Sequence, residues 1–155
     1  MGRIPWGPGT FGSVVGLGWF ALLLATGNVY LFLAGIVLSI GLSVWLCGEG
    51  EKILKQKDPG SIVLDEIVAI PVCGLVWVWL QWRTAHVLPT ADKFLSTWRL
   101  ILFLFVFFRI FDIAKPWPIR KSQSLPSGWG VTVDDLLAAV YVNVVVGVGV
   151  WLRVI

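Results

Sequence analysis

The sequence has very little charge. Only 14% of its 155 residues are Asp, Glu, Lys or Arg, whereas 57% are hydrophobic and the mean hydropathy is +0.86. Because an ordinary soluble domain carries about 25% charged residues, this composition excludes both a soluble globule and a disordered chain. It predicts a single domain over residues 1–155, an all-α polytopic bundle that lies in a membrane.

Cysteine and histidine are nearly absent. Cys47 and Cys73 lie inside apolar runs, so we expect reduced packing residues and no disulfide. The single His86 excludes a phosphatase with a histidine nucleophile, and neither cysteine is followed by the glycine-rich loop and arginine of a cysteine phosphatase. The Gly-x-Ser-x-Gly elbow, the Asp-x-Asp nucleophile motif and the phosphate-binding P-loop are also missing. Covalent catalysis by the common nucleophiles is therefore unsupported.

The excess of basic residues is small. Twelve Lys and Arg against nine Asp and Glu give a net charge of +3, which indicates no nucleic-acid partner. The cations lie mainly between apolar stretches, and ten tryptophans suit the interfacial belts of a bilayer protein. The expected partner is the membrane itself.

Five apolar stretches are long enough to consider as membrane crossings. About 20 helical residues cross a hydrocarbon core of about 30 Å, and the second stretch meets this length with ease. The others are shorter, and an alternative for the first is a re-entrant segment. The stretches are Phe11–Ala25, Val29–Cys47, Ile67–Trp82, Phe94–Phe108 and Leu136–Leu152. Loops and short helices are expected between them on the cytoplasmic side.

The distribution of charge predicts the orientation. With the N-terminus in the cytoplasm, five crossings place residues 1–10, 48–66 and 109–135 inside, with eight cations there and three outside. This satisfies the positive-inside rule. The same threading places eight of the nine acids inside and only Asp92 outside.

The acids nearest the membrane are the most informative. Asp65 and Glu66 adjoin the third stretch, Asp134 and Asp135 adjoin the fifth, and Asp112 follows the fourth. Carboxylates at membrane depth are costly and usually face a functional cavity. Acids in the first turn of a helix interact favourably with the helix dipole, by about 0.3–1 kcal/mol, and this effect could explain either pair alone. Two pairs at one level predict a shared site, and hard oxygen ligands of this kind suit Mg²⁺.

Cations and small residues accompany the acids. Arg109, Asp112 and Lys115 share one side of a predicted helix. Pro116 and Pro118 end this helix, and Arg120 follows them. One interpretation is a ladder of salt bridges. The other is that Arg109, Lys115 and Arg120 bind phosphate beside Asp112. The helix start at Thr10 and Ser13 is a weaker phosphate-binding candidate, since either hydroxyl could simply be an N-cap.

Four strings of the sequence resemble the phosphatidylglycerophosphatase A family of bacterial membrane phosphatases. They follow the family's order and extend over nearly the whole chain, and the third is specific by itself. Two small departures are Ala69 and Ala139, where glycine is expected. The strings are PGTFGS (8–13), KDPGSIVLDE (57–66), RIFDIAKPWPIR (109–120) and GVTVDD (130–135).

The resemblance implies an enzyme with a phospholipid substrate in the bacterial inner (cytoplasmic) membrane. The implied reaction is the Mg²⁺-dependent removal of the terminal phosphate of phosphatidylglycerophosphate, which gives phosphatidylglycerol and inorganic phosphate at the cytoplasmic face. Water and an aspartyl side chain both remain open as the nucleophile. Two other functions also remain open: a phosphatase for other lipid phosphates, such as phosphatidic acid, and a non-catalytic lipid- or ion-binding membrane subunit.

Roles for individual residues follow from this implied reaction. The expected metal ligands are Asp65, Asp134 or Asp135, with Glu66 assisting. We expect Asp112 to act as general base or second ligand. Arg109, Lys115 and Arg120 would offset the charge on the phosphoryl oxygens.

Overall fold

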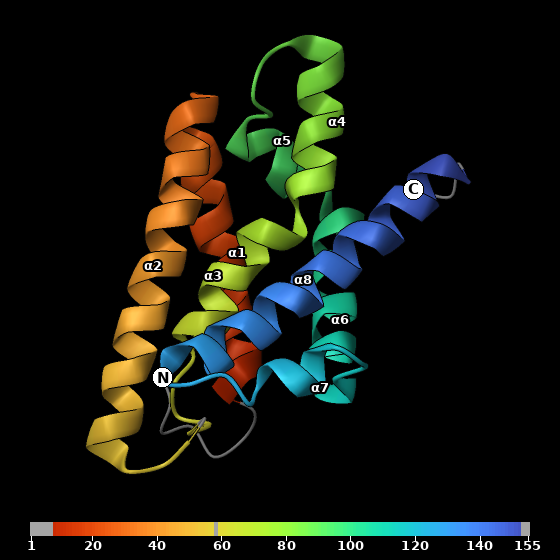
Figure 1. Ribbon diagram of the computed structural model, residues 1–155. Helices are drawn as coiled ribbons and strands as arrows, with labels where there is room; N and C mark the ends of the chain where they lie inside the picture. The colour runs from red at the N-terminus through yellow and green to blue at the C-terminus, as the bar shows by residue number, and fades with distance from the viewer. Residues whose placement is uncertain (1–7, 58, 153–155) are drawn as a thin grey trace.

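The computed structural model describes residues 8–57 and 59–152, and within them the chain forms eight helices and no strand. The predicted all-α bundle is confirmed (Figure 1). Asp58 and Arg153 lie outside the described residues, as does the start of the chain. The helices are α1 (Pro8–Ala25), α2 (Val29–Leu54), α3 (Leu64–Cys73), α4 (Leu75–Ala85), α5 (Ala91–Ser96), α6 (Trp98–Ala114), α7 (Ile119–Ser122) and α8 (Gly128–Trp151).

Four helical segments of the described chain are long and apolar enough to cross a membrane. They are Pro8–Ala25, Val29–Leu54, Leu64–Ala85 and Gly128–Trp151, and four of the five predicted stretches lie in them with small shifts at their ends. α2 is the least covered by protein, with large side chains such as Leu38 and Trp45 exposed. In a membrane protein such a surface contacts lipid, which explains its apolar composition.

The fourth predicted stretch, Phe94–Phe108, is wrong as a single helix. The chain breaks at Thr97, which separates α5 from the 17 residues of α6. The hydroxyl of Thr97 donates to the carbonyl of Lys93 at 2.8 Å, and its amide donates to the carbonyl of Phe94 at 3.0 Å. These bonds satisfy the end of α5 locally, as threonine side chains often do where a helix stops. α6 is then at the lower limit of about 17–25 residues for a crossing.

The third crossing is also broken, at Gly74 between α3 and α4. A side chain at Gly74 would collide with the ring of Phe20 on α1, so glycine lets the two helices approach closely. Asn143 of α8 pairs with the backbone at this break. Its amide nitrogen donates to the carbonyl of Val72 at 2.7 Å, and its amide oxygen accepts from the nitrogen of Val76 at 2.8 Å. The break is thus satisfied inside the protein, as a bilayer requires.

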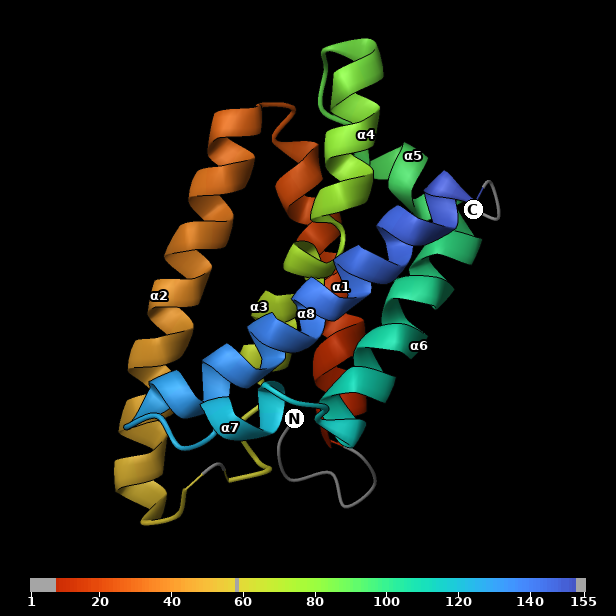
Figure 2. The same ribbon diagram turned by 45° about the vertical axis from the view of Figure 1, so that its right-hand side comes forward.

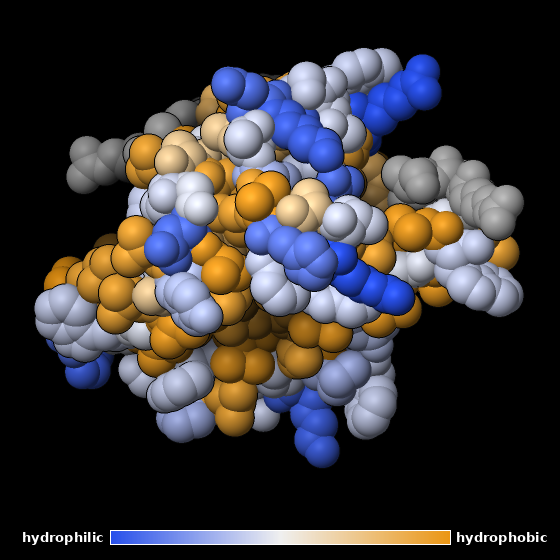
Figure 3. Space-filling model, turned by 90° about the horizontal axis from the view of Figure 1, so that it is seen from above, coloured by the Kyte–Doolittle hydropathy of each residue, from blue (hydrophilic) through white to orange (hydrophobic). Residues whose placement is uncertain are grey.

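α3 lies at the centre of the bundle. It packs against α1, α2, α6 and α8, and α8 crosses in front of it to reach the far end (Figures 1 and 2). The fully buried rings of Phe20, Phe32 and Phe94 form an aromatic cluster in the core, with the centroids of Phe20 and Phe94 4.5 Å apart. Figure 3 views the molecule from the end that holds the α1–α2 turn. Hydrophilic side chains project there between apolar ones.

Candidate active site

The acid-bearing turns of three helices meet at one end of the bundle, the lower end in Figure 1. Asp65 and Glu66 lie in the first turn of α3, Asp112 in the last turn of α6, and Asp134 and Asp135 in the second turn of α8. Arg109 contacts Glu66 and Asp112, and Lys115 contacts Asp134, so two cations link the three turns. The five acids therefore lie at the same end of the bundle.

Arg109 and Lys115 bind the acids from the α6 side. Nη1 of Arg109 lies 2.7 Å from Oδ2 of Asp112 on its own helix and 3.3 Å from Oε1 of Glu66 on α3. Nζ of Lys115, just after α6, lies 2.6 Å from Oδ2 of Asp134 on α8. The salt bridge of the first interpretation is therefore present between Arg109 and Asp112, and Arg109 and Lys115 also contact carboxylates of neighbouring helices.

Three of the acids are buried almost completely. Asp65 is 7% exposed, Asp134 2% and Asp135 3%. Asp134 is compensated, since it accepts from Lys115 and from the amide nitrogen of Gln123 at 3.1 Å. By contrast, Oδ1 of Asp65 and Oδ2 of Asp135 are buried with no hydrogen-bond partner. Buried carboxylate oxygens are normally paired or bound to a metal, because leaving them unpaired costs free energy.

The donor set fits a magnesium ion that retains water. Among the residues that the structure describes, no three Asp, Glu, His or Cys side chains come close enough together to cage a metal. Mg²⁺ does not need such a cage, because it is usually held by one or two carboxylates, several waters and substrate phosphate. Asp65 and Asp135 each supply a buried oxygen that has no hydrogen-bond partner. Glu66 and Asp134, also expected as ligands, are bound to Arg109 and Lys115.

The start of α1 makes room for Glu66. A side chain at Gly9 would collide with the carboxylate of Glu66 and come within 2.8 Å of Nη1 of Arg109, and Gly12 faces the same carboxylate. The glycines of the first string therefore allow α1 to pack directly against the acids. This explains their presence without a phosphate at the helix start.

The other predicted phosphate-binding residues lie at varied places. Ser13 is fully buried and its hydroxyl donates to the carbonyl of Gly9 at 2.9 Å, whereas Thr10 is exposed. Arg120 is exposed on α7. Of the predicted cations, the structure therefore brings Arg109 and Lys115 into direct contact with the acids.

Sequence reasoning missed several polar residues around the acids. Gln123, in the connection between α7 and α8, binds Asp134, and no pattern in the sequence marks it. The hydroxyls of Ser43 on α2 and Thr132 on α8 hydrogen-bond to each other at 3.0 Å and are fully buried. Thr132 lies within the string GVTVDD, which was the available signal. This bond holds α2 against the turn of α8 that carries the acids.

The fold and this site define a class: a polytopic, all-helical membrane enzyme with buried carboxylates and cations gathered at one end. The sequence model of the family described as phosphatidylglycerophosphatase A matches residues 1–150, and the chain belongs to this family. Members with this name are phosphatases, so the chain is an enzyme of the lipid phosphatase type.

Curated relatives cover most of the chain. A protein of Haemophilus influenzae named phosphatidylglycerophosphatase A is 36% identical over 140 residues, which are 90% of this chain and 76% of the relative. One of the same name from Escherichia coli is 33% identical, over 90% of this chain and 72% of the relative. A putative phosphatidylinositol-3-phosphatase of Bacteroides thetaiotaomicron is 31% identical, over 97% and 87%. No solved structure matches the chain.

Proposed function

We propose that this protein hydrolyses the terminal phosphate of phosphatidylglycerophosphate in a Mg²⁺-dependent reaction at the cytoplasmic face of the bacterial inner membrane. Family membership supports the reaction. The observation that carries the metal dependence is the pair of buried, unpartnered carboxylate oxygens on Asp65 and Asp135. The excess of cations in the segments at this end supports the cytoplasmic orientation.

The protein's own residues then have distinct tasks. Asp65 and Asp135 would hold Mg²⁺, which when bound polarises phosphoryl oxygens and favours attack by water. Arg109 and Lys115 are positioned by Glu66, Asp112 and Asp134, so their charges are fixed next to the reacting phosphate before it arrives. Such preorganised charge stabilises the charge on the phosphoryl oxygens in the transition state.

We assign the proton transfer from the attacking water to Asp112. In the proposed reaction, a water oxygen forms the new bond to phosphorus as the bond to the glycerol oxygen breaks. Asp112 is partly buried at the edge of the cluster and bound on one oxygen by Arg109. It would take the proton from the attacking water, while the leaving glycerol oxygen takes a proton from solvent.

Phosphate release from the purified protein in detergent tests this function. We expect release from phosphatidylglycerophosphate with Mg²⁺, none with EDTA, and a loss of at least about a hundredfold in the Asp65→Asn and Asp134→Asn variants, as for other residues that stabilise a transition state. Asp92→Asn is the matched control, because Asp92 lies on α5, outside the cluster. Equal activity with EDTA, or in the Asp65→Asn variant, would refute the assignment of the metal site.

A second substrate is favoured by one relative. The Bacteroides protein carries the name of a putative phosphatidylinositol-3-phosphatase and matches nearly the whole chain. We therefore include phosphatidylinositol-3-phosphate in the same assay. Faster release from this lipid, at equal mole fraction in the micelle, would replace phosphatidylglycerophosphate as the proposed substrate.

A further inference from the structure

A cavity of about 590 Å³ lies among α4, α6 and α8, at the end of the bundle opposite the acid cluster. This end holds the end of α4 and the last turns of α8 (Figure 2). α8 packs against both α4 and α6, so the three helices border a shared space. The volume is within the range of about 300–1,000 Å³ that is typical of ligand pockets.

The charged residue of this cavity is Arg99, in the first turn of α6. Its guanidinium carbon lies 5.6 Å from the centre of the ring of Trp98. None of the salt bridges among the described residues involves Arg99. Ionisable residues in membrane segments are costly, and they usually have a partner or mark a binding site. Arg99 therefore presents an uncompensated positive charge to the cavity.

Three uncharged polar residues line the cavity together with Arg99: Gln81, Thr84 and Thr97. The hydroxyls of both threonines donate to backbone carbonyls, so their oxygens remain available as acceptors. The amide oxygen of Gln81 accepts from Nζ of Lys93, which brings a second positive charge to the edge of the cavity. The described part of the lining contains no acid.

The rest of the lining is apolar. Trp77 of α4, Leu100 of α6 and Val146 of α8 are among these residues, and all three are buried. Trp77 lies two turns before Thr84 on the same helix, about 10 Å closer to the middle of the bundle at 1.5 Å per residue. The cavity is thus polar near the helix ends and apolar toward the interior.

The polar part lies at the level of lipid headgroups. Thr84 is in the last turn of the crossing Leu64–Ala85, and Arg99 is at the start of α6. The exposed Trp82, Trp98 and Trp151 lie at the ends of the same three helices. Tryptophans gather at the interface between membrane and water. The cavity therefore has the polarity of a phospholipid, with the place for a headgroup at the membrane surface.

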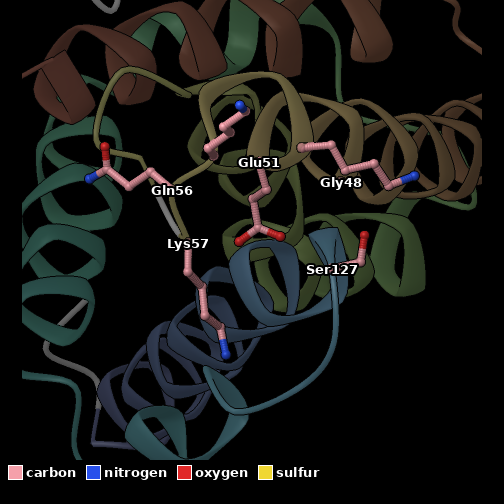
Figure 4. Close-up of a pocket in the computed structure, with 7 residues that line it drawn as sticks. Gly48, Glu51, Gln56, Lys57 and Ser127 are labelled. Atoms are coloured by element: carbon pink, nitrogen blue, oxygen red, sulfur yellow. The ribbon is translucent and has the colours of Figure 1, made fainter.

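The cavity at the end of α2 differs in each of these respects. It has a volume of about 320 Å³, and Figure 4 shows the carboxylate of Glu51 within it, directed toward the start of α8. Its lysines are exposed, and Lys52 is bound to Glu49 at 2.6 Å. The described part of its lining has no large apolar side chain, so it offers no place for an acyl chain.

The charges around the first cavity favour an anionic headgroup. The guanidinium fork of Arg99 suits a phosphodiester, because it can donate to two phosphate oxygens at once. Basic pockets between transmembrane helices are known to bind anionic headgroups. A headgroup with an ammonium or choline group would find no acid in the described lining and would meet Lys93 at the edge. A glycerol headgroup is uncharged beyond its phosphate, and its hydroxyls can donate to Thr84 and Thr97.

We propose that the cavity among α4, α6 and α8 binds an anionic phospholipid with a glycerol headgroup, phosphatidylglycerol, from the leaflet opposite the acid cluster. Arg99 binds the phosphodiester, and Thr84 and Thr97 accept from the headgroup hydroxyls. An acyl chain fills the space along Val146 and Val150. This lipid site is separate from the acid cluster and does not depend on the reaction proposed above.

Titration of the detergent-purified protein with phosphatidylglycerol or phosphatidylcholine, followed by native mass spectrometry, tests the charge of the site. We expect the wild type to bind phosphatidylglycerol at least about tenfold more tightly, and the Arg99→Gln variant to lose most of this preference. Arg83→Gln is the matched control. Arg83 also lies against a tryptophan ring, that of Trp79 at 5.5 Å, but does not line the cavity. Its replacement should leave the preference unchanged.

Val150→Trp tests the cavity with the charge unchanged. The larger side chain fills the apolar part, so we expect the same loss of preference. Val148→Trp is the control, because Val148 is exposed on the same helix. Any phosphatidylglycerol bound at the acid cluster is unaffected by these changes, so differences between variants report the cavity alone.

Equal affinity of the wild type for the two lipids would overturn the proposal. Unchanged preference in Arg99→Gln or in a folded Val150→Trp variant would overturn it too. Phosphate release should stay within about twofold of the wild type in Arg99→Gln, because the acids lie at the other end. A wild type without phosphatase activity would refute the proposed function, whereas the binding measurements would still decide whether the lipid site exists.

Discussion

Asp135 is buried next to the equally buried Asp134, and one of its own oxygens has no hydrogen-bond partner. Two opposite effects meet in this one side chain. Burial of a carboxylate among like charges lowers the stability of the folded chain. The same arrangement provides strong attraction for a divalent cation that enters. Function and stability should therefore respond in opposite directions when the charge is removed.

The Asp135→Asn variant tests this opposition. Asparagine has nearly the same shape and removes the negative charge, so we expect activity to fall by at least about a hundredfold. Without Mg²⁺, the melting temperature in detergent should rise by a few degrees, as expected for about 1 kcal/mol gained. Differential scanning fluorimetry with EDTA measures this shift. A melting temperature below that of the wild type would contradict the account of Asp135.

Gly9 gives a second residue-scale prediction. In the Gly9→Ala variant the new methyl group must displace the carboxylate of Glu66 and, with it, Arg109. We expect phosphate release to fall by about tenfold or more, because small displacements of positioning groups are costly in enzymes. Gly18→Ala on the same helix is the matched control, since no atom lies within 4 Å of its added methyl group. Similar activity of the two variants would show that the contact between α1 and Glu66 is unimportant.

At the scale of helices, the break at Gly74 places α3 and α4 on slightly different axes. Asn143 of α8 bonds to backbone groups on both sides of the break. In the Asn143→Leu variant, the nitrogen of Val76 and the carbonyl of Val72 lose this partner inside the protein. Each buried unsatisfied group costs about 1–3 kcal/mol, so we expect a melting temperature lower by several degrees.

The control for Asn143 is Val144→Leu, an exposed apolar residue on the same helix. Its larger side chain enters lipid and should leave the melting temperature unchanged. A stable Asn143→Leu variant would mean that the backbone at the break finds other partners.

The helices also show what the sequence could and could not predict. Hydropathy located the apolar stretches, because length and composition alone decide whether a segment suits a bilayer. The acids could be located too, because they lie at or near the ends of these stretches. The breaks at Gly74 and Thr97 were missed, since the first depends on Phe20 and Asn143, which are distant in sequence. Gln123 was missed as a site residue because only the fold brings it to Asp134.

At the scale of the whole molecule, the chain is polarised. The acid-bearing ends of α3, α6 and α8 all lie at one end of the bundle, together with α7 and the end of α2 (Figure 2). The loop between α4 and α5 and the turn between α1 and α2 lie toward the other end. A substrate with its charge in the headgroup can reach the acids only from one leaflet. The orientation of the protein in the membrane therefore decides which leaflet it acts on.

Cysteine labelling measures this orientation. Cys47 and Cys73 are buried, so the wild-type protein should react little with a membrane-impermeant maleimide. In spheroplasts, we expect the Asp92→Cys variant on α5 to be labelled, because Asp92 is exposed at the predicted outer side. The Lys121→Cys variant on α7 should be labelled only after the membrane is permeabilised. The positive-inside count of eight cations to three predicts this result. Labelling of Lys121→Cys in intact spheroplasts would instead place the acids at the outer leaflet and contradict the proposed cytoplasmic orientation.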